Sequence, residues 1–317
     1  MSQLSGAESH VSQELLAALL RFNLVLGLAV LAVLVLRVPV RRMFGPEVAY
    51  GLWAAPPAAA LASIMPARVD DAAPQVHALT AALADWSGAA LLAWAAGAAL
   101  VVAGLARAQA QFMVEAREGR AGPSVVGVIA PRILMPADNG SYTPEERALI
   151  RAHEREHVAR CDPRAGAAAA MLQALCWFNP LVHLGAHLLR LDQELACDAA
   201  VLRRRPHDRA LYARTLLKTQ LASQPLPFGC YWPATGQHPL EVRIGLLRSA
   251  QRYDAMIGSA LIGTAIVSAA LAAWHLQPPA PRPGALVELW ERQQRQPVTS
   301  VMLVSLPPRP PAETPDR

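Results

Sequence analysis

The chain has 317 residues, of which 53% are hydrophobic and 17% are charged, and its formal net charge at pH 7 is +5. With its positive mean hydropathy, this composition excludes an ordinary soluble protein and predicts several membrane spans. The positive charge is almost all arginine beside the apolar runs, without a helix-turn-helix or base-stacking pattern. Direct nucleic acid binding is therefore not expected.

Four apolar runs are candidates for helices that span the lipid bilayer. They are Leu15–Leu36, Val48–Met65, Trp86–Ala106 and Ala255–Leu276. The first lacks a basic segment before it and exceeds the core of a signal peptide, so a retained anchor is predicted. The second is the weakest candidate, because it is short and its two adjacent prolines would kink a helix.

The placement of arginine predicts the orientation of these spans. No Lys or Arg precedes the first span, whereas the loop after it carries Arg37, Arg41 and Arg42. Further arginines lie between the third and fourth spans, namely Arg107, Arg117, Arg120, Arg243, Arg248 and Arg252. This pattern predicts a multi-pass protein with both termini outside and residues 107–254 in the cytoplasm.

Residues 107–254 are expected to form a compact α+β domain inserted into an otherwise mainly α protein. The stretch Ser124–Pro136 is rich in β-branched residues and is interrupted at Ala130-Pro131, which predicts two short strands. Prolines on both sides would confine the second strand to a sheet edge, where it could bind an extended substrate. The residues of this predicted substrate strand are Arg132, Ile133, Leu134 and Met135. A purely structural hairpin is the alternative.

A potential metal-binding helix follows these strands. His153 and His157 lie four residues apart, so both imidazoles project from one helix face and can bind the same ion. Glu154 is placed to take a proton from a metal-bound water without being a ligand. The helix is predicted to begin with a capping box formed by Thr143 and Glu146. The alternative is a charged, solvated helix without a metal.

A second predicted helix, from about Pro180 to Arg204, carries Glu194 and Asp198, which are also four residues apart. With His153 and His157, Glu194 would give two imidazoles and a carboxylate and leave one coordination position open. That is the pattern of a catalytic zinc site, with one Zn²⁺ per chain. Asp198 is suited to accept the free ring N–H of a ligand histidine.

Three stretches, "APRILMP", "HEREHVARCD" and "WFNPLVHLGAHLLRLDQELACDAAVL", resemble the BlaR/MecR-type membrane metallopeptidases, the antirepressor family of bacteria. The resemblance runs from about Leu15 to Leu276 and is most specific over Pro131–Leu202. It implies a gluzincin-like zinc peptidase at the bacterial inner membrane. By the family pattern the zinc ligands are His153, His157 and Glu194, the catalytic base is Glu154, and Asp198 matches the motif's last aspartate.

The C-terminal part of the chain departs from this family. Members that sense β-lactams carry a large outer penicillin-binding domain after the last span, whereas residues 277–317 are rich in proline and predicted to be extended or disordered. The chain has no Ser-x-x-Lys motif, so covalent β-lactam sensing is not supported.

The predicted organisation has four parts. They are a three-helix transmembrane region at 1–106, a cytoplasmic zinc peptidase domain at 107–254, a fourth transmembrane helix at 255–276 and a Pro-rich periplasmic or extracellular tail at 277–317. The four transmembrane helices and the inserted α+β domain together define the predicted fold.

The leading functional hypothesis is a zinc metalloendopeptidase that cleaves a cytoplasmic protein in signal transduction. The family resemblance implies that this substrate is a transcriptional repressor. A proteolytically silent membrane receptor or scaffold, and a quality-control protease for membrane proteins, are the alternatives. Besides the substrate and the bilayer, candidate partners are a second copy of the chain and a periplasmic protein that pairs with the tail.

Overall fold

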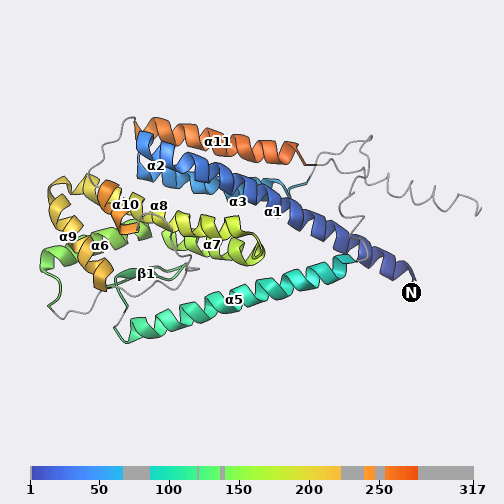
Figure 1. Ribbon diagram of the computed structural model, residues 1–317, viewed down its shortest axis with the longest axis horizontal. Helices are drawn as coiled ribbons and strands as arrows, with labels where there is room; N and C mark the ends of the chain where they lie inside the picture. The colour runs from blue at the N-terminus through green and yellow to red at the C-terminus, as the bar shows by residue number, and fades with distance from the viewer. Residues whose placement is uncertain are drawn as a thin grey trace, which may run out of the picture. The chain divides into compact units, whose positions relative to one another are not determined.

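The computed structural model describes residues 2–66, 86–119, 121–135, 140–222, 239–246 and 254–277. Helices make up most of these residues, and one small sheet accompanies them (Figure 1). The mainly α class is therefore confirmed. Apart from Gln277, the predicted outer tail lies outside the described residues.

Three described helices are long and apolar enough to cross a membrane. They are α1 (Ser2–Phe44), whose apolar part is Val11–Phe44, α5 (Ser87–Arg117) and α11 (Ala255–His275). Large apolar side chains such as Leu24 and Leu100 are 62% and 75% exposed on them, which suits contact with lipid. Three of the four predicted spans thus have the required length and composition.

The remaining predicted span, Val48–Met65, is not confirmed as a single membrane-crossing helix. This stretch is divided among three short helices, α2 (Pro46–Gly51), η1 (Leu52–Ala54) and α3 (Ala55–Ala62). Pro56 lies in the first turn of α3, where a proline is tolerated because its missing N–H has no helical partner. Helix α3 packs against both α1 and α11.

The two predicted strands are confirmed as an antiparallel hairpin of β1 (Ser124–Val126) and β2 (Arg132–Leu134), in which Val125 pairs with Ile133. Gly127 follows β1 with a φ of +93°, and a Cβ added there would lie 2.7 Å from the Ala130 carbonyl oxygen. Only glycine accommodates both conditions, so the turn depends on it.

The zinc helix predicted after the strands is α6 (Pro144–Ala159), and its capping box is confirmed. The Glu146 N–H donates to Thr143 Oγ1 at 3.2 Å, and the Thr143 N–H donates to Glu146 Oε2 at 2.9 Å. Helices α7 (Asp162–Leu175), α8 (Pro180–Arg204), η3 (Pro206–Asp208), α9 (Arg209–Ala222) and α10 (Pro239–Leu246) follow. A buried cluster of Leu149, Val201, Leu202 and Tyr212 joins α6, α8 and α9.

Helices α7 and α8 form a hairpin whose turn contacts two of the candidate membrane spans (Figure 1). Asn179 Nδ2 donates to Asn23 Oδ1 of α1 at 2.9 Å. Trp94 Nε1 of α5 donates to the Leu175 carbonyl oxygen at 2.8 Å, and Trp177 Nε1 donates to the Trp94 carbonyl oxygen at 3.1 Å. The helix that delivers Glu194 therefore begins beside the apolar spans α1 and α5.

Candidate metal centre

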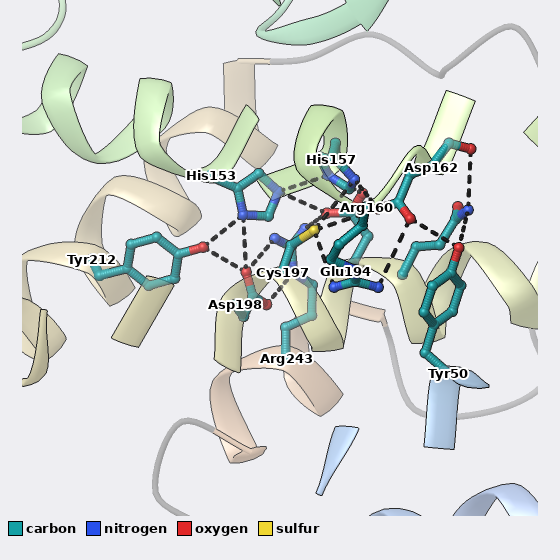
Figure 2. Close-up of polar contacts among 11 residues, drawn as sticks. Tyr50, His153, His157, Arg160, Asp162, Glu194, Cys197, Asp198, Tyr212 and Arg243 are labelled. Atoms are coloured by element: carbon teal, nitrogen blue, oxygen red, sulfur yellow. Dashed lines mark hydrogen bonds and ion pairs between the residues drawn. The ribbon is translucent and has the colours of Figure 1, made fainter. Parts of the chain in front are cut away.

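Helices α6 and α8 bring the three predicted metal ligands together (Figure 2). The Nε2 atoms of His153 and His157 are 3.1 Å apart. Glu194 Oε2 lies 3.3 Å from His153 Nε2, and Glu194 Oε1 lies 3.5 Å from His157 Nε2. The two imidazoles come from successive turns of α6, and α8 packs against this helix to supply the carboxylate.

The spacing of these donor atoms fits a zinc ion. Ligand atoms about 2.0–2.2 Å from zinc at tetrahedral angles lie about 3.3–3.5 Å from one another. A second group that could hold a metal consists of His157, Asp162 and Cys197. This group would use Nδ1 of His157, whereas the first group uses Nε2. Burial raises the pKa of Cys197 to about 11, and its S–H donates to Asp162, so a metal bound there would have to displace the proton of this buried thiol. The group of His153, His157 and Glu194 therefore fits a zinc ion better.

Glu154 lies between the two histidines in the chain and is only 5% exposed. Burial raises the pKa of its carboxyl above the ordinary glutamate value, although the neighbouring imidazoles act in the opposite direction. It lines the same cavity as the three predicted ligands. A carboxylate with a raised pKa beside an open metal position is suited to exchange protons with a substrate.

The imidazole of His157 is oriented by Asp162. His157 Nδ1 donates to Asp162 Oδ2 at 2.8 Å, which leaves Nε2 directed at Glu194. Burial would lower the pKa of His157, but hydrogen bonds to Asp162, Cys197 and Glu194 raise it well above its ordinary value. Sequence reasoning missed Asp162, which lies five residues after His157 at the end of the motif "HEREHVARCD".

The imidazole of His153 is oriented by a chain of two hydrogen bonds. Its Nδ1 is 2.8 Å from the Tyr212 hydroxyl, which in turn donates to Asp198 Oδ1 at 2.6 Å. Asp198 Oδ1 itself lies 3.4 Å from His153 Nδ1. The expected direct partnership of Asp198 with a ligand histidine is thus found at longer range, with Tyr212 between the two groups.

Arg243 of α10 holds two acidic side chains of α8, Glu194 and Asp198. Its Nε and Nη2 atoms donate to the two oxygens of Asp198 at 2.8 Å each, and its Nη1 lies 2.8 Å from Glu194 Oε2. Burial would raise the pKa of Glu194, but Arg243 and the two imidazoles hold it well below its ordinary range. Sequence reasoning had treated Arg243 only as an arginine flanking a span, because its partners are distant in the chain.

A cavity of about 630 Å³ opens over this cluster. Strand β1 and the following Gly127 and Val128 line it, together with Gln109, Phe112 and Glu115 of α5. The predicted substrate strand, Arg132–Met135, is not among the lining residues, because β2 is placed behind β1. The strand that lines the cavity is therefore β1, and not the predicted substrate strand.

A family model described as BlaR1 peptidase M56 matches residues 70–247. The chain belongs to this family. BlaR1-type M56 proteins are membrane peptidases of the metallopeptidase type that act in signalling, and this chain has helices suited to crossing a membrane. The matched region includes His153, Glu154, His157 and Glu194 as well as Arg243.

The chain is 33% identical over 81 residues to the regulatory protein BlaR1 of Bacillus licheniformis. The alignment covers 26% of this chain and 14% of that M56 relative. No solved structure matches the chain.

Proposed function

We propose that this M56 member is an integral-membrane zinc endopeptidase that cleaves a cytoplasmic protein. The observation that carries the proposal is the near-tetrahedral spacing of His153, His157 and Glu194 on one wall of the cavity, with Glu154 beside them. These three side chains would hold the ion. When bound, zinc would supply Lewis-acid polarisation of a carbonyl and lower the pKa of a coordinated water.

The side chains around the ligands have separate tasks in this proposal. Glu154 takes a proton from the attacking water and returns it to the leaving amine, for which its buried, raised-pKa carboxyl is suited. Asp162 and Tyr212 occupy the Nδ1 sides of His157 and His153, which leaves each Nε2 beside Glu194 and free to hold a zinc ion. Arg243 secures the third ligand from α10.

A substrate segment would pair with β1. This strand lines the cavity and has β2 on one side only, so its other edge is available for backbone hydrogen bonds within the described two-stranded sheet. Arg132–Met135 would then support the substrate-binding strand as its partner.

The substrate we propose is a transcriptional repressor, as the family resemblance implies, and the site would face the cytoplasm. Both termini would be outside the inner membrane, in keeping with the arginines on the loop after α1. Residues 107–254 would form the peptidase domain. Residues 1–106 and 255–276 would anchor it, with the stretch 48–65 as the additional membrane-embedded part.

The decisive experiment compares the full-length wild type with Glu154→Gln in detergent, using fluorogenic peptides and metal analysis. We expect the variant to keep one zinc per chain and to lose cleavage by a factor of about 10²–10⁴, since the proton acceptor is removed and the ligands are not. Undiminished cleavage would remove Glu154 from its role. A wild type that binds no zinc would refute the whole proposal.

A further inference from the structure

The outer partners of the metal centre include residues that precede α5 in the chain. Tyr50 of α2 donates its hydroxyl to Asp162 Oδ1 at 2.8 Å, while the other oxygen of that carboxylate accepts from His157 Nδ1, also at 2.8 Å. Asp162 is 5% exposed. Both of its oxygens are thus occupied, one by a predicted zinc ligand and one by a tyrosine from the segment after the first span.

Tyr50 is itself held by residues next to the site (Figure 2). Gln193, the residue before Glu194, donates from Nε2 to the Tyr50 hydroxyl at 3.3 Å. The Arg160 guanidinium lies over the Tyr50 ring at 4.5 Å from its centre, a favourable cation–π contact. The Tyr50 side chain is therefore fixed by Arg160 at the end of α6 and by Gln193 of α8. These contacts keep its hydroxyl directed at Asp162.

A second contact joins the first span to the helix that carries Glu194. Arg37 of α1 donates from Nε and Nη2 to the two oxygens of Asp192 at 2.8 Å each, and Trp53 Nε1 donates to Asp192 Oδ2 at 2.8 Å. Asp192 is 1% exposed and Arg37 is 8% exposed. A buried bidentate pair with a further donor has little freedom, so it fixes the position of the α8 turn that carries Glu194.

We propose that Tyr50 and Arg37 are positioning residues of the metal centre. Tyr50 orients His157 through Asp162, and Arg37 fixes the Glu194-bearing turn of α8 through Asp192. The inference rests on the proposed function, because it assigns these residues to the same zinc site. Both lie before residues 70–247, the part that the family model matches, so they extend the centre to α1 and α2.

The first test is Tyr50→Phe in the full-length protein, which keeps the ring over Arg160 and removes only the hydroxyl. Zinc affinity is measured by competition with a chromogenic chelator, and the visible spectrum of the Co²⁺ form is recorded. We expect zinc to bind about 10–100-fold more weakly, as is typical when an outer partner of a ligand histidine is lost, and the Co²⁺ bands to shift. The matched control is Tyr142→Phe, since Tyr142 contacts Lys218 and neither residue lines the cavity.

Tyr50→Phe binding zinc as tightly as the control, with an unchanged Co²⁺ spectrum, would overturn the role of Tyr50. Wild-type protein is titrated first under the same conditions. If it bound no zinc, the proposed function itself would fail, whereas normal wild-type binding with an unaffected variant contradicts only the positioning role.

The second test concerns Arg37. Asp192 also lies 3.4 Å from Arg41, whose side chain is only 11% exposed. Because removing the carboxylate alone would leave buried positive charge, the double variant Arg37→Gln with Asp192→Asn is made together with Arg41→Gln, which retains hydrogen-bonding groups at all three positions. We expect a folded protein, by circular dichroism and elution volume, that binds zinc about tenfold more weakly. Wild-type zinc affinity in the folded multiple variant would overturn the role of Arg37. If this multiple variant does not fold, Arg37→Lys is tested instead, because lysine keeps the positive charge but cannot form the bidentate pair with Asp192. Zinc affinity equal to wild type in that variant would likewise overturn the role.

Discussion

At the scale of single residues, the two histidines of the centre are oriented by different chemistry. A carboxylate contacts His157 directly, whereas a phenol stands between His153 and its carboxylate. Burial, followed by the nearby Asp198, raises the pKa of Tyr212 well above its ordinary value. The phenol therefore stays protonated over the working pH range, donates to Asp198 and accepts from His153.

This arrangement predicts the effect of Tyr212→Phe. The substitution leaves the ring in the buried cluster with Leu149 and Val201 but removes the group that orients His153. We expect a protein of near-normal thermal stability with zinc affinity reduced about 10–100-fold, measured by chelator competition. An unchanged affinity would show that Asp198, 3.4 Å from His153 Nδ1, orients the imidazole without the phenol.

The sequence was enough to predict which side chains converge at the proposed metal centre, but not most of their partners. The spacing of His153 and His157 is local, because an α-helix brings every fourth side chain to the same face. Arg243 and Asp192 make their contacts with residues 45 and 155 positions away, respectively. No local period encodes such pairs, which depend on how the helices pack.

At the scale of elements, the start of α6 illustrates how a short motif fixes a helix that carries ligands. The Lys218 ammonium donates to Glu146 Oε2 at 2.8 Å, and the Thr143 N–H donates to the same carboxylate. These two hydrogen bonds hold the pKa of Glu146 below its ordinary value. The ionised form is therefore more favourable in the folded protein than in the unfolded chain.

The resulting stability should depend on pH in a defined direction. A lowered folded-state pKa contributes stability above the ordinary glutamate pKa, about 4.3, and this contribution is lost as the pH falls through the lowered value. Glu146→Gln keeps a capping-box side chain but cannot ionise. We expect the midpoint temperature of wild type to exceed that of the variant at pH 7 and the difference to shrink toward pH 3. A difference that stays constant with pH would contradict this assignment.

The contact between α5 and the α7–α8 turn gives a second prediction for an element. A Cβ added at Gly97 would lie 2.2 Å from the Trp177 ring, so the ring must move. Gly97→Ala should therefore destabilise the protein by about 1–3 kcal/mol, the usual cost of overpacking, as measured by thermal unfolding in detergent. Gly104→Ala, on the same helix with nothing within 4 Å of the added Cβ, is the control and should be neutral or slightly stabilising, because alanine favours a helix over glycine. Equal midpoints for the two variants would exclude the tight contact.

Among the elements, the hairpin and α6 could be predicted from local signals in the sequence. The structure of the stretch Val48–Met65 could not. β-branched residues and paired prolines indicate strands, and a capping box marks a helix start, both from a few neighbouring residues. Whether an apolar run of borderline length becomes one helix depends on what packs around it. Here α1 and α11 cover three short helices instead.

At the scale of the whole molecule, the proposed catalytic centre draws on residues from most of the described chain. Arg37 of α1 binds Asp192, and Tyr50 of α2 donates a hydrogen bond to Asp162. Arg243 of α10 binds Glu194, and residues of α5 form part of the cavity wall. The candidate span α1 is therefore connected through a buried polar contact to the turn of α8 that carries Glu194, a predicted ligand. A displacement of α1 relative to α8 would act first on Asp192, two positions from Glu194.

The insertion of the α7–α8 turn beside the spans has a practical consequence. An excised fragment beginning at residue 107 would lack Asn23 and Trp94, two side chains that hydrogen-bond this turn. Trp177 and Phe178, already 36% and 48% exposed, would lose the apolar spans beside them. Such a fragment should aggregate or require detergent, although its sequence contains every proposed zinc ligand. Biochemistry on this protein therefore needs the intact polypeptide in a lipid or micellar environment.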